Sequence, residues 1–147
     1  MSAITETAQQ SLDRTRHQAH PQCVVCGNKS SCSLGLRFRL LDNGSVEAKF
    51  DCPGRFQGYP SLLHGGVISS LLDGAITNCL FAHGLMAVTA ELRIRFRHPV
   101  RTDTSSTITA RITRCSPPLY IGQAELQQGG RVMSTATGKF MEKKPPG

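Results

Sequence analysis

The clearest feature of the hydrophobic pattern is one long stretch in which apolar residues recur at helical spacing. Between Gly65 and His83 the recurring residues are Ile68, Leu71, Leu72, Ala75, Ile76 and Cys79. Spacings of three and four place side chains on one face of an α-helix. Gly84 follows as a stop signal, so the sequence predicts a helix over residues 65–83 with a broad apolar face.

Apolar and polar residues alternate on both sides of this helix, which predicts β-strands. Before the helix, residues 34–41 and 45–50 alternate around Asp42-Asn43-Gly44, a typical hairpin turn. After the helix, segments rich in Thr, Val and Ile predict four more strands, at residues 87–100, 105–114, 119–128 and 131–141. The first two strands therefore form a hairpin, and a larger group of strands follows the helix.

The order of these elements indicates the fold class. Residues 51–63, between the second strand and the helix, are predicted to be irregular because they contain Pro53, Gly54, Gly58 and Pro60. A helix that is apolar over most of its circumference has to be covered by the sheet, so we expect the sheet to curl around it. The prediction is an α+β protein with a curved antiparallel β-sheet of about six strands wrapped around one long central helix.

Length and composition indicate how the chain is organised. The chain has 147 residues, which suits a single domain, and we place that domain at residues 23–142. Residues 1–22 are a polar leader compatible with a helix, and residues 143–147 are expected to be a disordered tail. No continuous apolar block resembles a secretory signal or a membrane span, so we expect a cytoplasmic protein that does not bind membranes.

The net charge of +7 suits a negatively charged partner. Arg93, Arg95 and Arg97 alternate with apolar residues, which predicts a strand with one cationic face rather than a basic helix. Nucleic-acid recognition motifs are missing from the sequence, so we do not expect nucleic acid as a partner. The phosphates of a small molecule fit this charge equally well.

Cys23 and Cys26 have the spacing of half a zinc site. His17 or His20, together with Cys32, could complete such a site; the alternative is a turn with two partly buried thiols. Six cysteines in a chain without an export signal are expected to be thiols rather than disulfides. We expect a local structural role for this turn, with or without zinc, and no cofactor or metal in catalysis.

Candidate chemistry lies on the predicted helix. At 100° per residue, one narrow stripe contains Gly66, Ser70, Asp73 and Thr77. A lone carboxylate in an otherwise small or apolar helix costs stability unless it is paired or faces a cleft. Asp73 is therefore a catalytic candidate, and the alternative is a carboxylate on a solvated or subunit-contact face.

Gly65 and Gly66 begin the same helix. A helix amino terminus presents unpaired N–H groups, and glycine allows a ligand oxygen to come close to them. Such a terminus can stabilise an oxyanion, with His64 as an orienting group beside it. The alternatives are that the glycines only relieve crowding and that His64 is structural.

Two segments resemble a known family. Residues 58–73, GYPSLLHGGVISSLLD, and residues 88–100, VTAELRIRFRHPV, resemble the hotdog-fold thioesterases of the phenylacetate-pathway and 4-hydroxybenzoyl-CoA type. The resemblance implies a hotdog fold and hydrolysis of an acyl-CoA thioester. It implies that Asp73 acts as nucleophile or general base, that the Gly65 amide holds the thioester oxygen and that Thr77 helps to place water.

The resemblance also implies binding residues, with one departure. Thr89 matches a position that is polar in some members. The positive charge of Arg93, Arg95 and Arg97 suits the CoA phosphates independently of the resemblance, and the alternative is a solvated strand face. Gly66 is a further candidate for contact with the substrate. Many members have Asn or Gln where this chain has Gly58. Either Gln57 substitutes for that amide or its hydrogen bond is absent.

Helix geometry predicts the assembly. Gly65 and Asp73 are eight residues apart, which places their backbones about 12 Å apart along one helix. One carbonyl cannot easily contact both, so we expect a homodimer with shared active sites, or a dimer of dimers.

Two other functions remain as alternatives to thioester hydrolysis. One is a non-catalytic protein that binds acyl ligands, and the other is a hydratase that uses His64 as its base.

Overall fold

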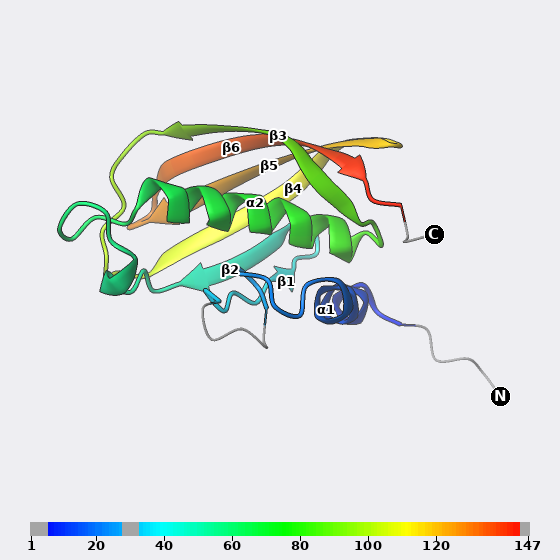
Figure 1. The fold of residues 1–147 in the computed structure, drawn as a ribbon, viewed down its shortest axis with the longest axis horizontal. Coiled ribbons are helices and arrows are strands. Elements are labelled where there is room, and N and C mark those ends of the chain that lie inside the picture. The colour runs from blue at the N-terminus through cyan, green and yellow to red at the C-terminus, as the bar shows by residue number, and fades with distance from the viewer. Residues whose placement is uncertain (1–5, 28–32, 145–147) are drawn as a thin grey trace.

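The computed structural model describes residues 6–27 and 33–144, and one long helix lies across its curved sheet (Figure 1). This helix, α2, spans Gly65–Ala82. The six strands are β1 (Arg39–Leu40), β2 (Val46–Phe50), β3 (Ala87–Phe96), β4 (Ser106–Ser116), β5 (Leu119–Gln128) and β6 (Arg131–Glu142). All neighbours are antiparallel in the order β1-β2-β4-β5-β6-β3, so β3 is an edge strand. The predicted α+β architecture, a curved antiparallel sheet of six strands around one long central helix, is confirmed.

Glycines in the sheet allow α2 to pack closely against it. Gly122 of β5 and Gly138 of β6 are direct partners, and both lie under Ile76. A Cβ atom on Gly138 would be 3.3 Å from Ile76 Cδ1, and one on Gly122 would overlap Ile76 Cγ2. By length and composition α2 could cross a membrane, but 67% of the helix is buried inside the fold, as expected for a core helix.

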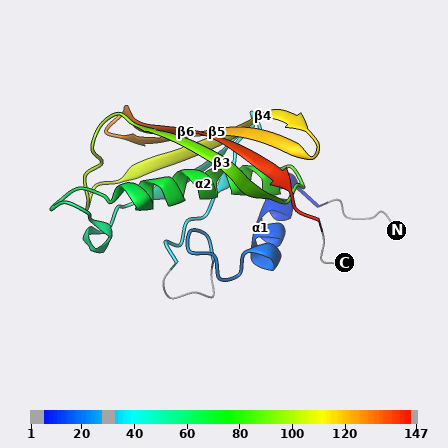
Figure 2. The same cartoon turned by 45° about the horizontal axis from the view of Figure 1, so that its top comes forward.

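The amino-terminal segment is part of the same core. Helix α1 spans Ala8–Ala19 and begins with a capping box between Thr7 and Gln10. Leu12 on α1 is completely buried in the main hydrophobic cluster, and Figure 2 shows α1 lying against the end of α2. A domain boundary at residue 22 therefore does not separate two physical units. The predicted tail is described only to residue 144.

The first predicted strand is wrong over most of its length. Residues 34–38 are irregular, and only Arg39–Leu40 pairs with β2. The backbone N–H groups of Leu34 and Leu36 donate instead to the carbonyl oxygens of Val24 and Val25, at 2.6 and 2.9 Å. Leu36 and Phe38 are buried in the main hydrophobic cluster, but the segment hydrogen-bonds to the cysteine turn rather than to the sheet.

The loop before α2 is more ordered than predicted. It contains a short 3-10 helix, Gly54–Phe56, and two isolated bridges. Gln57 pairs with Leu63, and Leu62 pairs with Arg101. These pairs hold the loop against the segment after β3 and fix where α2 begins.

Candidate active site

The amino terminus of α2 leaves one backbone donor unused. His64 is the N-cap, and its Nδ1 accepts a hydrogen bond from the Gly66 N–H at 2.8 Å. The His64 carbonyl oxygen accepts from the N–H groups of Val67 and Ile68, both at 3.0 Å. Within the described part of the chain, the Gly65 N–H has no acceptor. The Gly65 amide is therefore free to bind an oxygen atom at a helix terminus that favours negative charge.

Gly65 lines an open, mainly apolar cavity of about 480 Å³. Its walls come from the loop before α2, the first turn of α2 and the end of β3: Tyr59, Leu62, Leu63, Ile68, Phe96 and Val100 contribute apolar side chains. The Phe96 ring lies beside Gly65, 3.7 Å from where a Cβ atom would be. Sequence reasoning missed these lining residues because the two segments meet only through long-range pairing.

Asp73 lies on a half-buried position of α2 and has a defined partner. Thr89 Oγ1 donates a hydrogen bond of 2.6 Å to Asp73 Oδ1. A β-bulge at residues 89–91 makes this contact possible: Thr89 pairs with buried Phe140, while Leu92 pairs with Gly138 under α2. Because one extra residue separates these two pairs, both Thr89 and Leu92 face the helix. The structure thus places two of the predicted site residues in direct contact.

Burial raises the pKa of the Asp73 carboxyl group above its ordinary value. The hydrogen bond from Thr89 opposes this shift by stabilising the carboxylate. A carboxylate that is partly desolvated and held by one donor is more basic than an exposed one. This arrangement suits a group that accepts a proton or attacks a carbonyl carbon.

Two other predicted catalytic residues make local hydrogen bonds. The Thr77 hydroxyl is buried and donates to the Asp73 backbone carbonyl at 3.0 Å. Gln57 Oε1 accepts from the Ser61 N–H at 3.1 Å and so closes the turn before α2. A Cβ atom on Gly58 would lie 3.3 Å from His64 Cδ2, so this turn has little room for a larger side chain at residue 58.

Gly65 and Asp73 do not share a cavity in one chain. The cavity at Gly65 ends at Ile68, and Asp73 lies further along the helix. Of the four exposed or half-buried residues between them, Val67 is the larger one, and the other three are small: Gly66, Ser69 and Ser70. Both serine hydroxyls donate to backbone carbonyl oxygens of the preceding turn. This stretch of α2, which we call the small-residue stripe, gives another chain close access to the helix.

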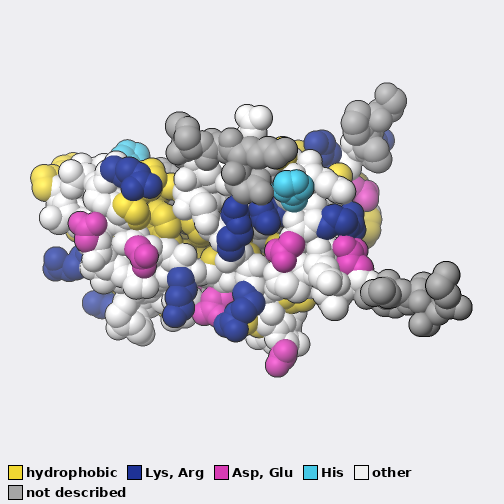
Figure 3. All heavy atoms as spheres, turned by 90° about the horizontal axis from the view of Figure 1, so that it is seen from below, with side chains coloured by type: hydrophobic (Ala, Val, Ile, Leu, Met, Phe, Trp, Pro, Cys, Tyr) yellow, Lys and Arg dark blue, Asp and Glu magenta, His cyan; other side chains and the backbone are white. Residues whose placement is uncertain are grey.

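The candidate phosphate-binding arginines are exposed along β3. Arg93, Arg95 and Arg97 alternate with the half-buried Leu92 and Ile94, so they point away from the core. Arg97 also lines the cavity at Gly65. Lys and Arg side chains on the face seen in Figure 3 are interspersed with Asp and Glu rather than gathered into a continuous basic surface.

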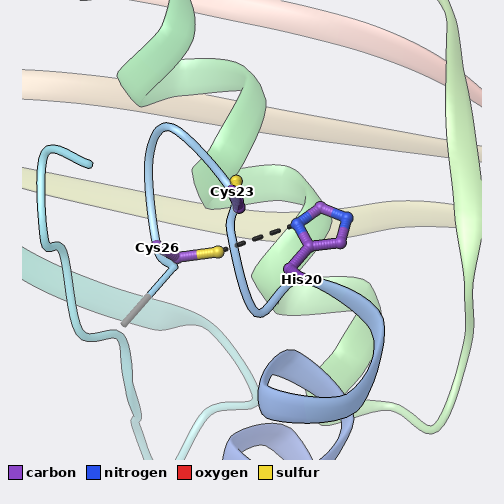
Figure 4. Close-up of side chains that lie close together, drawn as sticks. All are labelled: His20, Cys23 and Cys26. Atoms are coloured by element: carbon purple, nitrogen blue, oxygen red, sulfur yellow. Dashed lines mark hydrogen bonds between the residues drawn. The ribbon is translucent and has the colours of Figure 1, made fainter. Parts of the chain in front are cut away.

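A second polar cluster lies between α1 and α2. His20 Nδ1, Cys23 Sγ and Cys26 Sγ all lie within 4.8 Å of one another (Figure 4). A hydrogen bond from Cys26 is the main reason that the pKa of Cys23 falls to about 3, and the same bond raises the pKa of Cys26. Of the two candidate histidines, His20 rather than His17 is in the cluster; Cys32 lies outside the described residues.

The comparisons with known proteins agree with this architecture. The sequence model of the thioesterase superfamily matches residues 61–116, which contain α2, β3 and β4. The PaaI protein of the Escherichia coli phenylacetic acid degradation operon has a TM-score of 0.78 and 18% identity, over 94% of this chain and 97% of its own. A putative thioesterase of Ralstonia eutropha, a phenylacetic acid degradation-related protein, has a TM-score of 0.73 and 24% identity, over 89% and 98%.

One further similar structure contains a ligand. It is a hypothetical thioesterase of Streptococcus pneumoniae with coenzyme A, with a TM-score of 0.69 and 19% identity over 74% of this chain and 88% of its own. Another similar protein, of the thioesterase superfamily, is longer, and the chain spans 62% of its length. The chain thus has the fold of the hotdog thioesterases, and its segment around α2 matches the thioesterase superfamily, which confirms the resemblance predicted from residues 58–100.

Proposed function

We propose that this protein hydrolyses an acyl-CoA thioester to a carboxylic acid and CoA. The observation that supports this most is the single unused N–H of Gly65 at the edge of an apolar cavity. An acyl chain in that cavity would bring its thioester carbonyl to a preorganised donor. Such donors stabilise the negative charge that develops on the oxygen in acyl transfer.

Asp73 supplies the second group that the reaction needs. As a general base it takes a proton from water while the water oxygen bonds to the carbonyl carbon; the tetrahedral intermediate then expels the CoA thiolate, which is protonated. As a nucleophile it bonds to the carbonyl carbon and expels the CoA thiolate, which is protonated; water then hydrolyses the resulting anhydride to the free acid and the Asp73 carboxylate. Either role requires the carboxylate form, which the Thr89 hydroxyl stabilises.

The two groups act together if two chains share each site. Eight residues separate Gly65 from Asp73, or about 12 Å along one helix, whereas a base has to come within about 3 Å of its target. Antiparallel packing of two small-residue stripes would bring Gly65 of each chain near Asp73 of the other. The exposed apolar residues Val88 and Phe96 on the edge strand β3 are further surface that a dimer would cover.

CoA is the expected carrier of the acyl group. The net charge of +7 and the exposed arginines Arg93, Arg95 and Arg97 suit its phosphates, and a similar structure contains coenzyme A. A site that only binds acyl ligands has no use for a desolvated carboxylate next to a hydroxyl donor. A hydratase that relies on His64 would need a free imidazole, whereas His64 Nδ1 accepts from Gly66 N–H.

The direct test is a hydrolysis assay on a panel of aromatic, short-chain and long-chain acyl-CoAs, comparing wild type with Asp73→Asn. We expect turnover of at least one class and a loss of more than about tenfold in kcat for Asp73→Asn, with the fold retained. Asp42→Asn, in the exposed hairpin turn, is the matched control and should keep wild-type activity. No turnover by the wild type across the panel, or full turnover by Asp73→Asn, would contradict the proposal.

A further inference from the structure

The turn between α1 and α2 contains donors of the kind that bind zinc. Cys26 Sγ and His20 Nδ1 are 3.7 Å apart, and Cys23 Sγ lies within 4.8 Å of both. Around a tetrahedral Zn²⁺, bond lengths of about 2.3 Å to sulfur and 2.0 Å to nitrogen place neighbouring donors about 3.5–3.8 Å apart. We propose that His20, Cys23 and Cys26 form a zinc site, which needs only small shifts of the sulfur atoms.

The backbone of this turn brings both sulfur atoms to within 4.8 Å of each other. The Gly27 N–H donates to the Cys23 carbonyl oxygen at 2.9 Å, and the Val25 N–H donates to Cys23 Sγ at 3.4 Å. A Cβ atom on Gly27 would lie 2.6 Å from the Cys23 carbonyl oxygen, so the turn requires glycine here. An N–H donor to a sulfur atom stabilises its thiolate form, which is the form that binds metals.

The third donor is also held in place. His20 is the C-cap of α1, where its N–H donates to the Arg16 carbonyl oxygen at 2.8 Å. Its ring packs edge-on against Phe81 of α2, with 5.0 Å between ring centroids. Figure 4 shows the imidazole directed toward the two cysteine side chains. The ligands thus come from the end of a helix and the turn after it, and their directions are set by contacts with α2.

The turn that contains Cys23 and Cys26 packs on α2 at Gly74, the residue after Asp73. Val25, between the two cysteines, packs so closely on Gly74 that a Cβ atom there would lie 2.6 Å from Val25 Cγ1. Cys26 is fully buried, and buried Asn78 Oδ1 has no hydrogen-bond partner among the described residues. A bound zinc ion would tie the end of α1 to the turn that packs on α2, so its role would be structural.

Ligand type favours zinc, and the surroundings suit a fourth ligand. Two thiolates and one imidazole are the donors that zinc prefers over magnesium or calcium. A cavity of about 370 Å³, lined by Ala19 to Cys23, opens beside His20 and Cys23. Three protein ligands leave one tetrahedral position, and this cavity allows water to reach it. None of these three ligands takes part in the proposed hydrolysis, so the zinc site can be tested separately from it.

Metal analysis and cobalt spectroscopy test the site together. Wild-type protein purified with reductant and without chelator should contain about one zinc ion per chain. After zinc is removed, Co²⁺ should restore binding with thiolate charge-transfer bands and the intense visible bands of tetrahedral cobalt. Cys23→Ser and His20→Ala should reduce the zinc content at least about tenfold, whereas Cys115→Ser, at an exposed cysteine on β4, should leave it unchanged.

Measurements on the wild type alone can contradict the zinc site, so the test remains decisive even if a variant does not fold. Metal-free wild type that gives no thiolate bands with Co²⁺ contradicts the site. So does a Cys23–Cys26 disulfide in protein kept under reductant, or equal zinc content in the wild type and the Cys23→Ser variant. Removal of zinc should also lower the Tm of the wild type and of Cys115→Ser by similar amounts, and should leave the Tm of Cys23→Ser unchanged.

Discussion

Burial and the hydrogen bond from Thr89 act in opposite directions on the pKa of Asp73, and burial has the larger effect. The sequence identifies Asp73 because a lone acid stands out on a helix of small and apolar residues. It does not identify the partner from the pattern, because strict alternation from Leu92 would place Thr89 on the outer face. The β-bulge reverses that alternation, and a bulge has no reliable signature in one sequence. Thr89 was predicted only through the family resemblance.

Thr89→Val should weaken catalysis most at low pH. The Thr89 hydrogen bond lowers the pKa of Asp73, so its loss raises that pKa and less carboxylate is present at a given acidic pH. We expect kcat/KM to fall about tenfold, as for loss of a hydrogen bond to a charged group, with a smaller deficit as the pH rises. The acid limb of the pH–rate profile should move to higher pH.

Thr89→Ser is the matched control, because it keeps the hydroxyl group and removes only a methyl. Its acid limb should coincide with that of the wild type. A Thr89→Val profile that falls uniformly at all pH values would mean that Thr89 acts only in packing or substrate contact and not through Asp73.

At the scale of elements, the start of α2 has two separate functions. His64 caps the helix and uses the Gly66 N–H, which leaves the Gly65 N–H as the remaining donor. The glycine pair and the histidine could be recognised from the sequence, but not which of the two glycine N–H groups bonds to His64. The bonded N–H depends on which imidazole nitrogen faces the helix, and the conformation of the preceding loop sets this orientation.

His64→Ala should lower the free energy of unfolding by about 1 kcal/mol, because the Gly66 N–H loses its acceptor. His64→Asn should restore most of that stability, since asparagine is a good N-cap. Denaturant unfolding measures both. If His64 is a cap, His64→Asn should also hydrolyse acyl-CoA within about threefold of the wild-type rate; loss of hydrolysis with stability intact would make His64 a base.

Other elements show where sequence patterns succeed and fail. The helix prediction of residues 65–83 agrees with Gly65–Ala82 because its period is long and unbroken. Residues 34–38 have an equally regular alternation, yet they are not a strand. Their N–H groups bond to the cysteine turn, a partner that alternation alone cannot reveal. Burial was predictable from the pattern, whereas the hydrogen-bonding partner was not.

At the scale of the whole molecule, the features needed for hydrolysis are spread along one helix. The proposed oxyanion donor and the apolar cavity lie at the start of α2, and the carboxylate lies in its middle. In the proposed shared site, one chain therefore contributes half of each of two sites. The amino-terminal helix and the cysteine turn support α2 from the side opposite the sheet, so the stripe between the half-sites is held on a rigid element.

The measurement that tests the shared site most directly is complementation between two inactive variants. Gly65→Pro removes the donor and is tolerable at a first helical position, where an added Cβ atom would make only ordinary contact with Phe96. Asp73→Ala removes the carboxylate. Each variant alone should be inactive, and native mass spectrometry should show mixed dimers when the two are refolded together.

In an equal mixture, about half of the dimers contain both variants, and each of these has one intact site and one doubly damaged site. The shared site predicts recovery of about a quarter of the wild-type acyl-CoA hydrolysis rate. No recovery, in the presence of demonstrated mixed dimers, would mean that Gly65 and Asp73 act within one chain and would contradict the account.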